Sequence, residues 1–137
     1  MKTLFHLAFP VHDFALAKQF YQHTLGCEVG RESQNALIFN FGHHQIVAHK
    51  VEQPLAEQQT IYPRHFGLIF LERKAFDAFV DKLQDKGVPF EVPLKTRFAK
   101  TAIEHQSFFL KDPSNNLLEF KFYTNEGAIF GEHAHHQ

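Results

Sequence analysis

The sequence has one cysteine, no tryptophan and almost no net charge. Cys27 cannot form a disulfide within the chain, so the 137 residues must fold around an apolar core. No basic-then-apolar leader and no bilayer-spanning apolar run occurs, so we expect a cytoplasmic protein without a membrane partner. With 14 Lys and Arg against 15 Asp and Glu and no basic stripe, we expect a small-molecule partner and no nucleic acid.

Aromatic residues and histidines are abundant instead. Hydrophobic residues make up 44% of the chain and aromatic residues 15%, which is enough to fill the core of one domain. The chain has 11 histidines, some of them in the tail from His133 to His136. Histidine is the commonest metal ligand, so this number calls for a search for a metal site without predicting one by itself.

The chain carries one structural pattern twice. Residues Phe5 to Phe9 are typical of a strand, and Asp13 then caps a helix whose apolar spacing stops at Gly26. Residues 64–70 are typical of a second strand, followed by a second helical pattern that stops at Gly87. Short apolar segments separated by turn residues follow each helix. They predict the strands Cys27 to Arg31, Ala36 to Phe41, Gln45 to Lys50, Phe90 to Val92, Ser107 to Leu110 and Leu117 to Tyr123.

The predicted fold class is therefore α+β, with two βαβββ modules that form a curved mixed sheet with the helices on its outer face. We expect a single domain over residues 1–137, with module one at about 1–52, module two at about 61–124 and a loose tail at 125–137. The polar stretch 53–60 is predicted to link the modules, and the irregular segment 94–104 to form a loop over a site.

Three of the predicted strands carry one polar residue opposite an apolar face. Because side chains alternate along a strand, His6, His65 and Glu119 should project from the face that the helices leave uncovered. The apolar triplets on the other face are Phe5, Leu7 and Phe9, then Phe66, Leu68 and Phe70, then Leu118, Phe120 and Phe122.

Two imidazoles and one carboxylate form the facial triad that suits Fe(II), and Mn, Zn, Ni or Co can also bind it. A histidine that begins a strand is more often an ordinary, partly buried residue than a ligand. Glu119 is harder to explain without a partner, because a buried carboxylate carries a large desolvation cost. Alternation alone leaves both interpretations open.

The segment from Phe108 to Phe120, in which an Asp-Pro turn precedes a strand with a glutamate, resembles the closing hairpin of the vicinal oxygen chelate superfamily. This superfamily includes glyoxalase I, extradiol dioxygenases and bleomycin-resistance proteins, and the resemblance extends from about Thr3 to Tyr123. It implies one divalent metal, with Fe(II) favoured, bound by His6, His65 and Glu119, and it implies a homodimer.

The sequence departs from two family patterns. The fourth ligand position of glyoxalase I falls near Val47, which cannot bind a metal, although His49 shares its face. The tyrosine position of the ring-cleaving dioxygenases falls on Phe109, which argues against cleavage of a catechol. We therefore expect a three-ligand site, with His105 and Tyr123 as catalytic residues around it and with Arg97 as a further polar neighbour.

Three functions fit these residues. The first is a dioxygenase-like oxidoreductase that acts on a small substrate with vicinal oxygens. The second is a glyoxalase-like lyase or isomerase, and the third is a binding protein that sequesters its ligand without catalysis. Only the first needs redox-active iron, and the third needs no metal.

Overall fold

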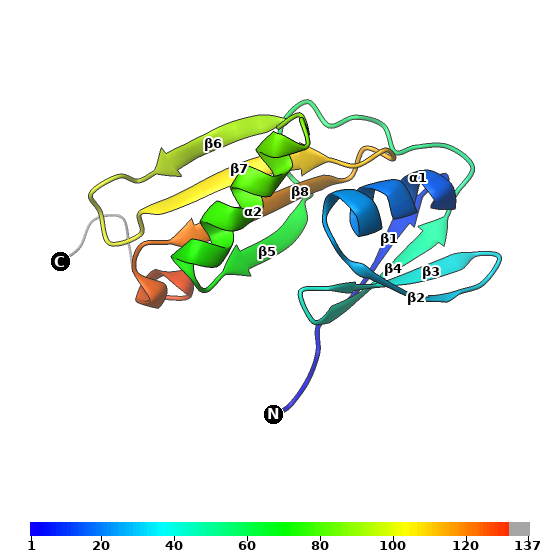
Figure 1. Ribbon diagram of the computed structural model, residues 1–137, viewed down its shortest axis with the longest axis horizontal. Helices are drawn as coiled ribbons and strands as arrows, with labels where there is room; N and C mark the ends of the chain where they lie inside the picture. Colours follow the sequence, from blue (N-terminus) through cyan, green and yellow to red (C-terminus); the bar gives the residue numbers. More distant parts are fainter. Residues whose placement is uncertain (132–137) are drawn as a thin grey trace. The chain divides into compact units, whose positions relative to one another are not determined.

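The computed structural model describes residues 1–131 and contains two compact units. The first comprises residues 1–62 with 111–116, and the second comprises residues 63–110 with those from 117 onward. Each unit has its own four-stranded sheet, and the element order repeats the predicted βαβββ pattern (Figure 1). Within residues 1–131, no helix has the length and apolar character needed to cross a membrane.

The first unit places its helix on one face of its sheet (Figure 1). Its strands have the order β1-β4-β3-β2, with β1 and β4 parallel and the other pairs antiparallel. The elements are β1 His6–Val11, α1 Phe14–Lys18, the π-helical turn η1 Gln19–Thr24, β2 Glu28–Glu32, β3 Ala36–Phe41 and β4 His44–Lys50.

Local sequence signals explain the helix of the first unit. The side chain of Asp13 accepts a 3.0 Å hydrogen bond from the backbone nitrogen of Leu16, as an N-cap residue does. Gly26 follows the helix with a φ of 82°, a conformation that glycine adopts at little cost. The buried ring of Tyr21 contacts Phe9 and Phe39, which fixes the helix against the sheet.

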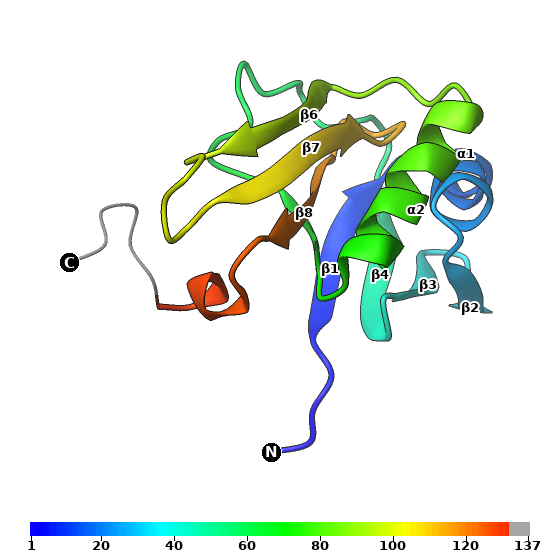
Figure 2. The same cartoon turned by 60° about the vertical axis from the view of Figure 1, so that its left-hand side comes forward.

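The second unit repeats this arrangement with a longer helix. Its strands have the order β5-β8-β7-β6, with β5 and β8 parallel, and β6, β7 and β8 lie side by side in Figures 1 and 2. The elements are β5 Phe66–Phe70, α2 Arg73–Asp85, β6 Val92–Arg97, β7 His105–Lys111, β8 Leu117–Tyr123 and the 3-10 helix η2 Glu126–Ile129.

Phenylalanine rings join α2 to its sheet. Phe76 and Phe79 of the helix contact Phe70, Phe108 and Phe120 of the strands at ring-centroid distances of 5.0 to 6.2 Å. The predicted apolar face of this sheet is therefore the face that the helix covers. Residues that alternate with these rings, among them Ser107, Glu119 and Lys121, lie on the opposite face, which we call the polar face.

Two sequence predictions need correction in the second unit. The second strand of this module was predicted at Phe90 to Val92, but β6 spans Val92–Arg97, so only residues 98–104 of the segment 94–104 form an irregular connection. This strand lies at the edge of the sheet and contains Pro93, Lys95 and Arg97, which are residues that natural edge strands use. The polar residues and the proline made this strand resemble a loop in the sequence.

Two smaller differences concern the ends of the chain. Phe5 was predicted to share the covered face of β1, but it precedes the strand and is 61% exposed. Loose structure was expected from residue 125, but Glu126–Ile129 form a 3-10 helix in which Ala128 is buried. The histidines of the tail, at 133, 135 and 136, lie outside the described residues.

The turn that precedes β8 belongs to the first unit. Asp112 is buried and accepts 2.8 Å hydrogen bonds from the backbone nitrogens of Ser114 and Asn116. Its Oδ2 also accepts a 2.7 Å bond from the Tyr21 hydroxyl. Burial raises the pKa of Asp112, and these hydrogen bonds oppose that rise. The Asp-Pro turn is thus anchored to the helix of the first unit.

Candidate functional site

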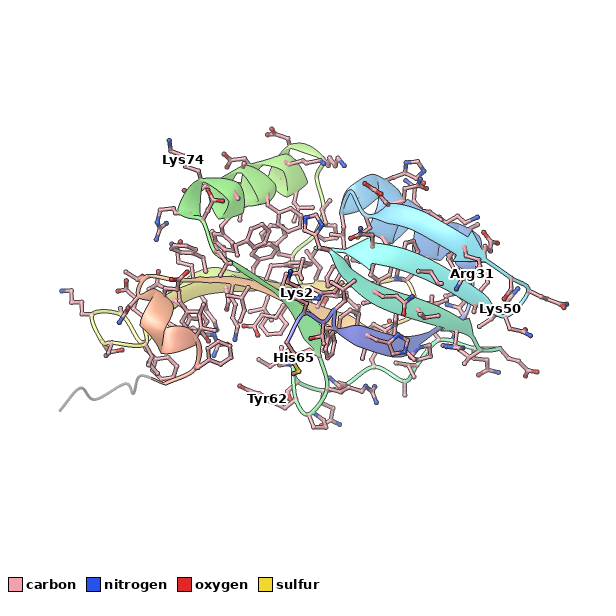
Figure 3. All side chains as sticks on the ribbon, turned by 90° about the horizontal axis from the view of Figure 1, so that it is seen from below. Lys2, Arg31, Lys50, Tyr62, His65 and Lys74 are labelled. Carbon is pink, nitrogen blue, oxygen red and sulfur yellow. The ribbon has the colours of Figure 1, made fainter. Side chains whose placement is uncertain are left out.

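His65 and Glu119 come together in the second unit. His65 stands immediately before β5, Glu119 lies in the middle of β8, and His65 Nε2 is 3.3 Å from Glu119 Oε1. Both side chains are partly buried, at 23% and 13% exposure. In Figure 3 His65 lies on the side of the sheet away from α2, which carries Lys74. The two residues therefore meet on the polar face, as alternation predicted.

The spacing of this pair fits a shared divalent metal. With metal-to-ligand distances of about 2.0 to 2.2 Å, two neighbouring ligand atoms stand roughly 3.0 to 3.4 Å apart. The His65 and Glu119 atoms have that separation, and nitrogen with carboxylate oxygen is a donor set that iron and zinc accept. Lys121 Nζ lies 3.8 Å from the same Glu119 oxygen and balances its negative charge.

Gly67 explains how β5 approaches Glu119 so closely. Gly67 is paired with Glu119 in the parallel ladder between β5 and β8. A Cβ atom at position 67 would lie 1.6 Å from the Glu119 carbonyl oxygen and 2.8 Å from its nitrogen, and backbone atoms cannot yield as a flexible side chain can. Because Gly67 has no side chain, the β8 backbone at Glu119 can lie directly against β5.

His6 is held in the first unit by a polar partner. It begins β1, is paired with Gln45 of β4, and its Nδ1 lies 2.6 Å from Gln45 Oε1. Because an amide oxygen only accepts, Nδ1 must carry the hydrogen, and Nε2 of the neutral ring keeps its lone pair. A metal-binding histidine is commonly fixed by such a bond to its second nitrogen. His6 therefore also fits the role of a ligand.

A hollow of about 440 Å³ adjoins His6 in the first unit, lined also by Arg31, Gln45, Val47 and His49. Val47 stands where a fourth ligand was considered, and its apolar side chain offers no donor atom. His49 lines the same hollow, as its shared face predicted.

His105 and Tyr123 are neighbours on the second sheet. Their ring centroids are 4.7 Å apart. The ring of Phe98 also contacts His105, at a centroid distance of 6.0 Å. His105 is buried, and its Nδ1 donates a 3.0 Å hydrogen bond to the carbonyl oxygen of Ile103. Nε2 of the neutral ring is then the atom that can accept a proton. Phe109, at the tyrosine position of ring-cleaving enzymes, packs edge-on against His65 at 5.0 Å.

The structure brings together His65 and Glu119, while His6 lies in the other unit. In the described part of the chain, no three His, Cys, Asp or Glu side chains form a group that could hold a metal ion. Sequence reasoning missed Gln45, which only the strand pairing places beside His6. It also missed Gly67, although a glycine inside a strand pattern is a known signal of close backbone approach.

Comparisons with known proteins agree with this fold. The model of the glyoxalase/bleomycin resistance protein/dioxygenase superfamily matches residues 3–120. The crystal structure of a glyoxalase/bleomycin resistance protein/dioxygenase from Alicyclobacillus acidocaldarius is 39% identical, with a TM-score of 0.88, over 93% of this chain and 96% of that chain. No curated protein matches the chain at a significant level.

More distant structures share the fold alone. The genomically encoded fosfomycin resistance protein FosX of Listeria monocytogenes is 18% identical, with a TM-score of 0.69, over 93% of this chain and 98% of that chain. A lactoylglutathione lyase of Agrobacterium tumefaciens is also 18% identical, with a TM-score of 0.67, over 96% of this chain and 98% of that chain. The repeated βαβββ pattern, the family match and the 39% identical structure lead to one conclusion: this chain belongs to the glyoxalase/bleomycin resistance protein/dioxygenase superfamily.

Proposed function

We propose that this protein is a divalent-metal-dependent enzyme of the vicinal oxygen chelate type, with His6, His65 and Glu119 as metal ligands. The observation that carries the proposal is the 3.3 Å approach of His65 Nε2 to Glu119 Oε1 on the polar face. The hydrogen bond from His6 to Gln45 supports it, because it leaves the Nε2 lone pair of His6 free for a metal. Fe(II) is the favoured ion, with Mn, Zn, Ni or Co as alternatives.

The favoured reaction is dioxygenase-like oxidation of a small substrate with vicinal oxygens. Two histidines and one carboxylate leave open positions that suit this chemistry, and Val47 adds no fourth ligand. When bound, a divalent ion supplies positive charge that stabilises an oxyanion developing on such a substrate. Phe109 places a buried apolar ring against His65, and an apolar neighbour strengthens electrostatic interactions on that side of the ligand pair.

A second reaction, glyoxalase-like isomerisation or elimination, is favoured by His105. The bond from its Nδ1 to the carbonyl of Ile103 fixes the tautomer and leaves Nε2 as a base. Tyr123 packs against this ring and holds its orientation. In this proposal His105 Nε2 accepts a proton from the substrate carbon beside a carbonyl group, and the electron pair of the broken C–H bond forms an enolate. The same nitrogen returns the proton to the neighbouring carbon, so the isomerisation requires no change of metal oxidation state.

We further propose that the enzyme is a cytoplasmic homodimer that acts on a small molecule. His6 belongs to the first unit, and His65 and Glu119 belong to the second, so the proposed site needs both units. They could pair within one chain or between two copies. Mixing unfolded His6→Ala and Glu119→Ala proteins and refolding them together distinguishes these cases. Pairing between copies restores an intact site in the mixed dimer, whereas pairing within one chain restores none.

The first test is metal content. The untagged protein is purified without oxygen, and elemental analysis is repeated for His6→Ala, His65→Ala and Glu119→Ala, with His23→Ala in the exposed part of η1 as the control. If the protein contains stoichiometric iron and all three variants lose it, the first reaction is supported. The next measurement is then oxygen uptake with catechols and keto acids as substrates. Zinc, nickel or manganese favours the second reaction. No metal after reconstitution contradicts the proposal and leaves a ligand-binding protein.

A further inference from the structure

Ser107 presents a hydroxyl group without a partner inside the second unit. Its residue is 1% exposed, and no hydrogen bond to its Oγ exists within residues 1–131. Buried polar groups in folded proteins almost always have a partner, because losing water without replacement is costly. A buried hydroxyl that remains unpaired within the described residues points to a partner supplied by a bound ligand.

Arg97 presents a second such donor on the same face. Its Nε is buried and has no acceptor among the residues that the structure describes. Arg97 is paired with His105 in the ladder between β6 and β7, and Lys95 is paired with Ser107. Directly paired residues share a face, and Ser107 stands two residues after His105, so Arg97 and Ser107 lie on one face of the sheet.

This face is the polar face that carries Glu119. Phe108 packs on α2, so its neighbour Ser107 points away from the helix. The bonds from Asp112 N to Asn116 O and from Thr124 N to Glu104 O close the two ends of the pairing between β7 and β8. Counting inward from them places Lys121 opposite Ser107 and Glu119 opposite Phe109.

Ring contacts agree with this pairing. His105 packs on Tyr123 at 4.7 Å, and the His65 ring, which touches Glu119, packs on Phe109 at 5.0 Å. Both contacts are consistent with the alignment of β7 and β8 that the hydrogen bonds indicate. Ser107 therefore lies between Lys95 on one side and Lys121 on the other, one same-face position along the sheet from Glu119.

The charges of this region are predominantly positive. Lys95 is paired with Ser107, Arg97 is the next residue of β6 on the same face, and Lys121 has a weak 3.8 Å contact with Glu119. Lys121 would be released from that contact when a metal neutralises Glu119. An arginine, a lysine and a serine hydroxyl together form the donor set that binds carboxylate and phosphate oxygens.

We propose that Arg97, Ser107 and Lys121 form a subsite for an oxyanion group of the substrate. This inference deepens the proposed function and rests on it, because it describes a second end of the same substrate. Same-face residues along a strand stand about 7 Å apart. The substrate class is thus a small molecule with vicinal oxygens at the Glu119 end and a carboxylate, phosphate or phosphonate group a few bonds away.

The test uses metal-free protein that has been stripped with a chelator and two probes, inorganic phosphate and acetate. The Arg97 Nε–H gives its own signal in proton–nitrogen correlation spectra, which Arg97→Lys assigns. We expect a saturable shift of this signal with at least one probe. Tighter binding of phosphate indicates a phosphate-like oxyanion group on the substrate, and tighter binding of acetate indicates a carboxylate. Ser107→Ala and Lys121→Gln should each weaken that binding about tenfold or more.

Lys74→Gln is the matched control for Lys121→Gln. It removes the same charge from the exposed surface of α2, on the other side of the sheet, and should leave the affinity unchanged (Figure 3). Failure of both probes to shift the Arg97 signal overturns the subsite, and so does an equal loss in the control. The metal content of the protein before stripping is measured separately. A protein that contains no metal before stripping or after reconstitution, but still binds phosphate, contradicts only the proposed metal chemistry.

Ser107→Ala also separates a ligand contact from a structural one. If the hydroxyl serves a ligand, its removal takes away an unsatisfied buried group and should raise the melting temperature of the ligand-free protein while lowering its affinity for the probe. A lower melting temperature with unchanged affinity would show that Ser107 stabilises the fold instead. The change in melting temperature has opposite signs in the two cases, so this measurement distinguishes them.

Discussion

Gly67 lies opposite Glu119 in the parallel ladder of β5 and β8, where a Cβ atom would stand 1.6 Å from the Glu119 carbonyl oxygen. Gly67→Ala must therefore open the ladder beside the proposed ligand. We expect a loss of roughly 3 kcal/mol in the free energy of unfolding. We also expect weaker metal binding, because His65 immediately precedes β5. Urea denaturation and metal titration measure the two effects.

Gly131→Ala is the control for this substitution, because a Cβ atom at position 131 meets nothing within 4 Å. Its stability and its metal affinity should remain those of the unsubstituted protein. A Gly67→Ala protein of normal stability would contradict the close approach of the two strands.

Gln45 should set the metal affinity of His6 without touching the metal. Its Oε1 lies 2.6 Å from His6 Nδ1 and fixes the ring and its tautomer. Loss of such a partner lowers metal affinity by about 10- to 100-fold. We expect this loss for Gln45→Ala in a metal titration and none for Gln53→Ala in the exposed segment after β4. Nitrogen spectra of the His6 ring, with mixed tautomers in Gln45→Ala, provide a second measurement.

The Tyr21 hydroxyl should stabilise the turn that precedes β8. It is fully buried and donates a 2.7 Å hydrogen bond to Asp112 Oδ2, and the pKa of Tyr21 is raised by burial and by the neighbouring Asp112. Tyr21→Phe removes one bond to a carboxylate, which costs about 1.5 to 3 kcal/mol. Thermal unfolding measures this loss. Tyr62→Phe, at a residue that is 63% exposed, should change stability by less than about 0.5 kcal/mol.

Asp112 should make stability depend on pH in the acidic range. Burial raises its pKa above the ordinary value of 3.8, so the folded protein holds this proton at a higher pH than the unfolded chain does. The contribution of Asp112 is complete below the unfolded pKa and is lost as pH rises through the folded pKa. The unsubstituted protein should therefore gain stability relative to Asp112→Asn as pH falls from 7 toward 4.

Urea denaturation across that pH range measures the difference between the two proteins. The comparison cancels the opposite trend from Glu57 and Glu104, whose pKa values are lowered by hydrogen bonds from Lys111 and from Lys100 and Thr124. Asp85→Asn, at an exposed residue at the end of α2, is the control and should show a constant difference. A constant difference for Asp112→Asn as well would be inconsistent with a raised pKa.

Cys27 should react slowly with alkylating reagents. Burial raises the pKa of its thiol from 9.0 to about 12, so the thiolate at pH 8 is about a thousandfold scarcer than in a solvated cysteine. Because a thiolate of higher pKa is also more nucleophilic, part of this difference is offset, and we expect iodoacetamide to modify the folded protein at least about tenfold more slowly than the protein unfolded in urea. Similar rates in the two states would mean that the thiol is solvated.

Alternation and helix signals in the sequence predicted most of the fold. Period-two alternation identified the covered faces of β5 and β8, because only one face of each can pack on the phenylalanines of α2. Asp13 and the glycines at 26 and 87 marked the helix ends, because capping is a local interaction. The edge strand β6 was placed wrongly, because an edge strand tolerates polar residues that resemble a loop.

The sequence by itself determined the repeat of two βαβββ modules and the face on which His65 and Glu119 lie, since both follow from the order and periodicity of the residues along the chain. Only the tertiary structure decided that Gln45 holds His6, that Gly67 lies against Glu119 and that Ser107 has a buried hydroxyl without a partner. Each of these facts depends on which residues of neighbouring strands stand opposite one another. That register is set by packing between segments far apart in the chain, and no local pattern specifies it.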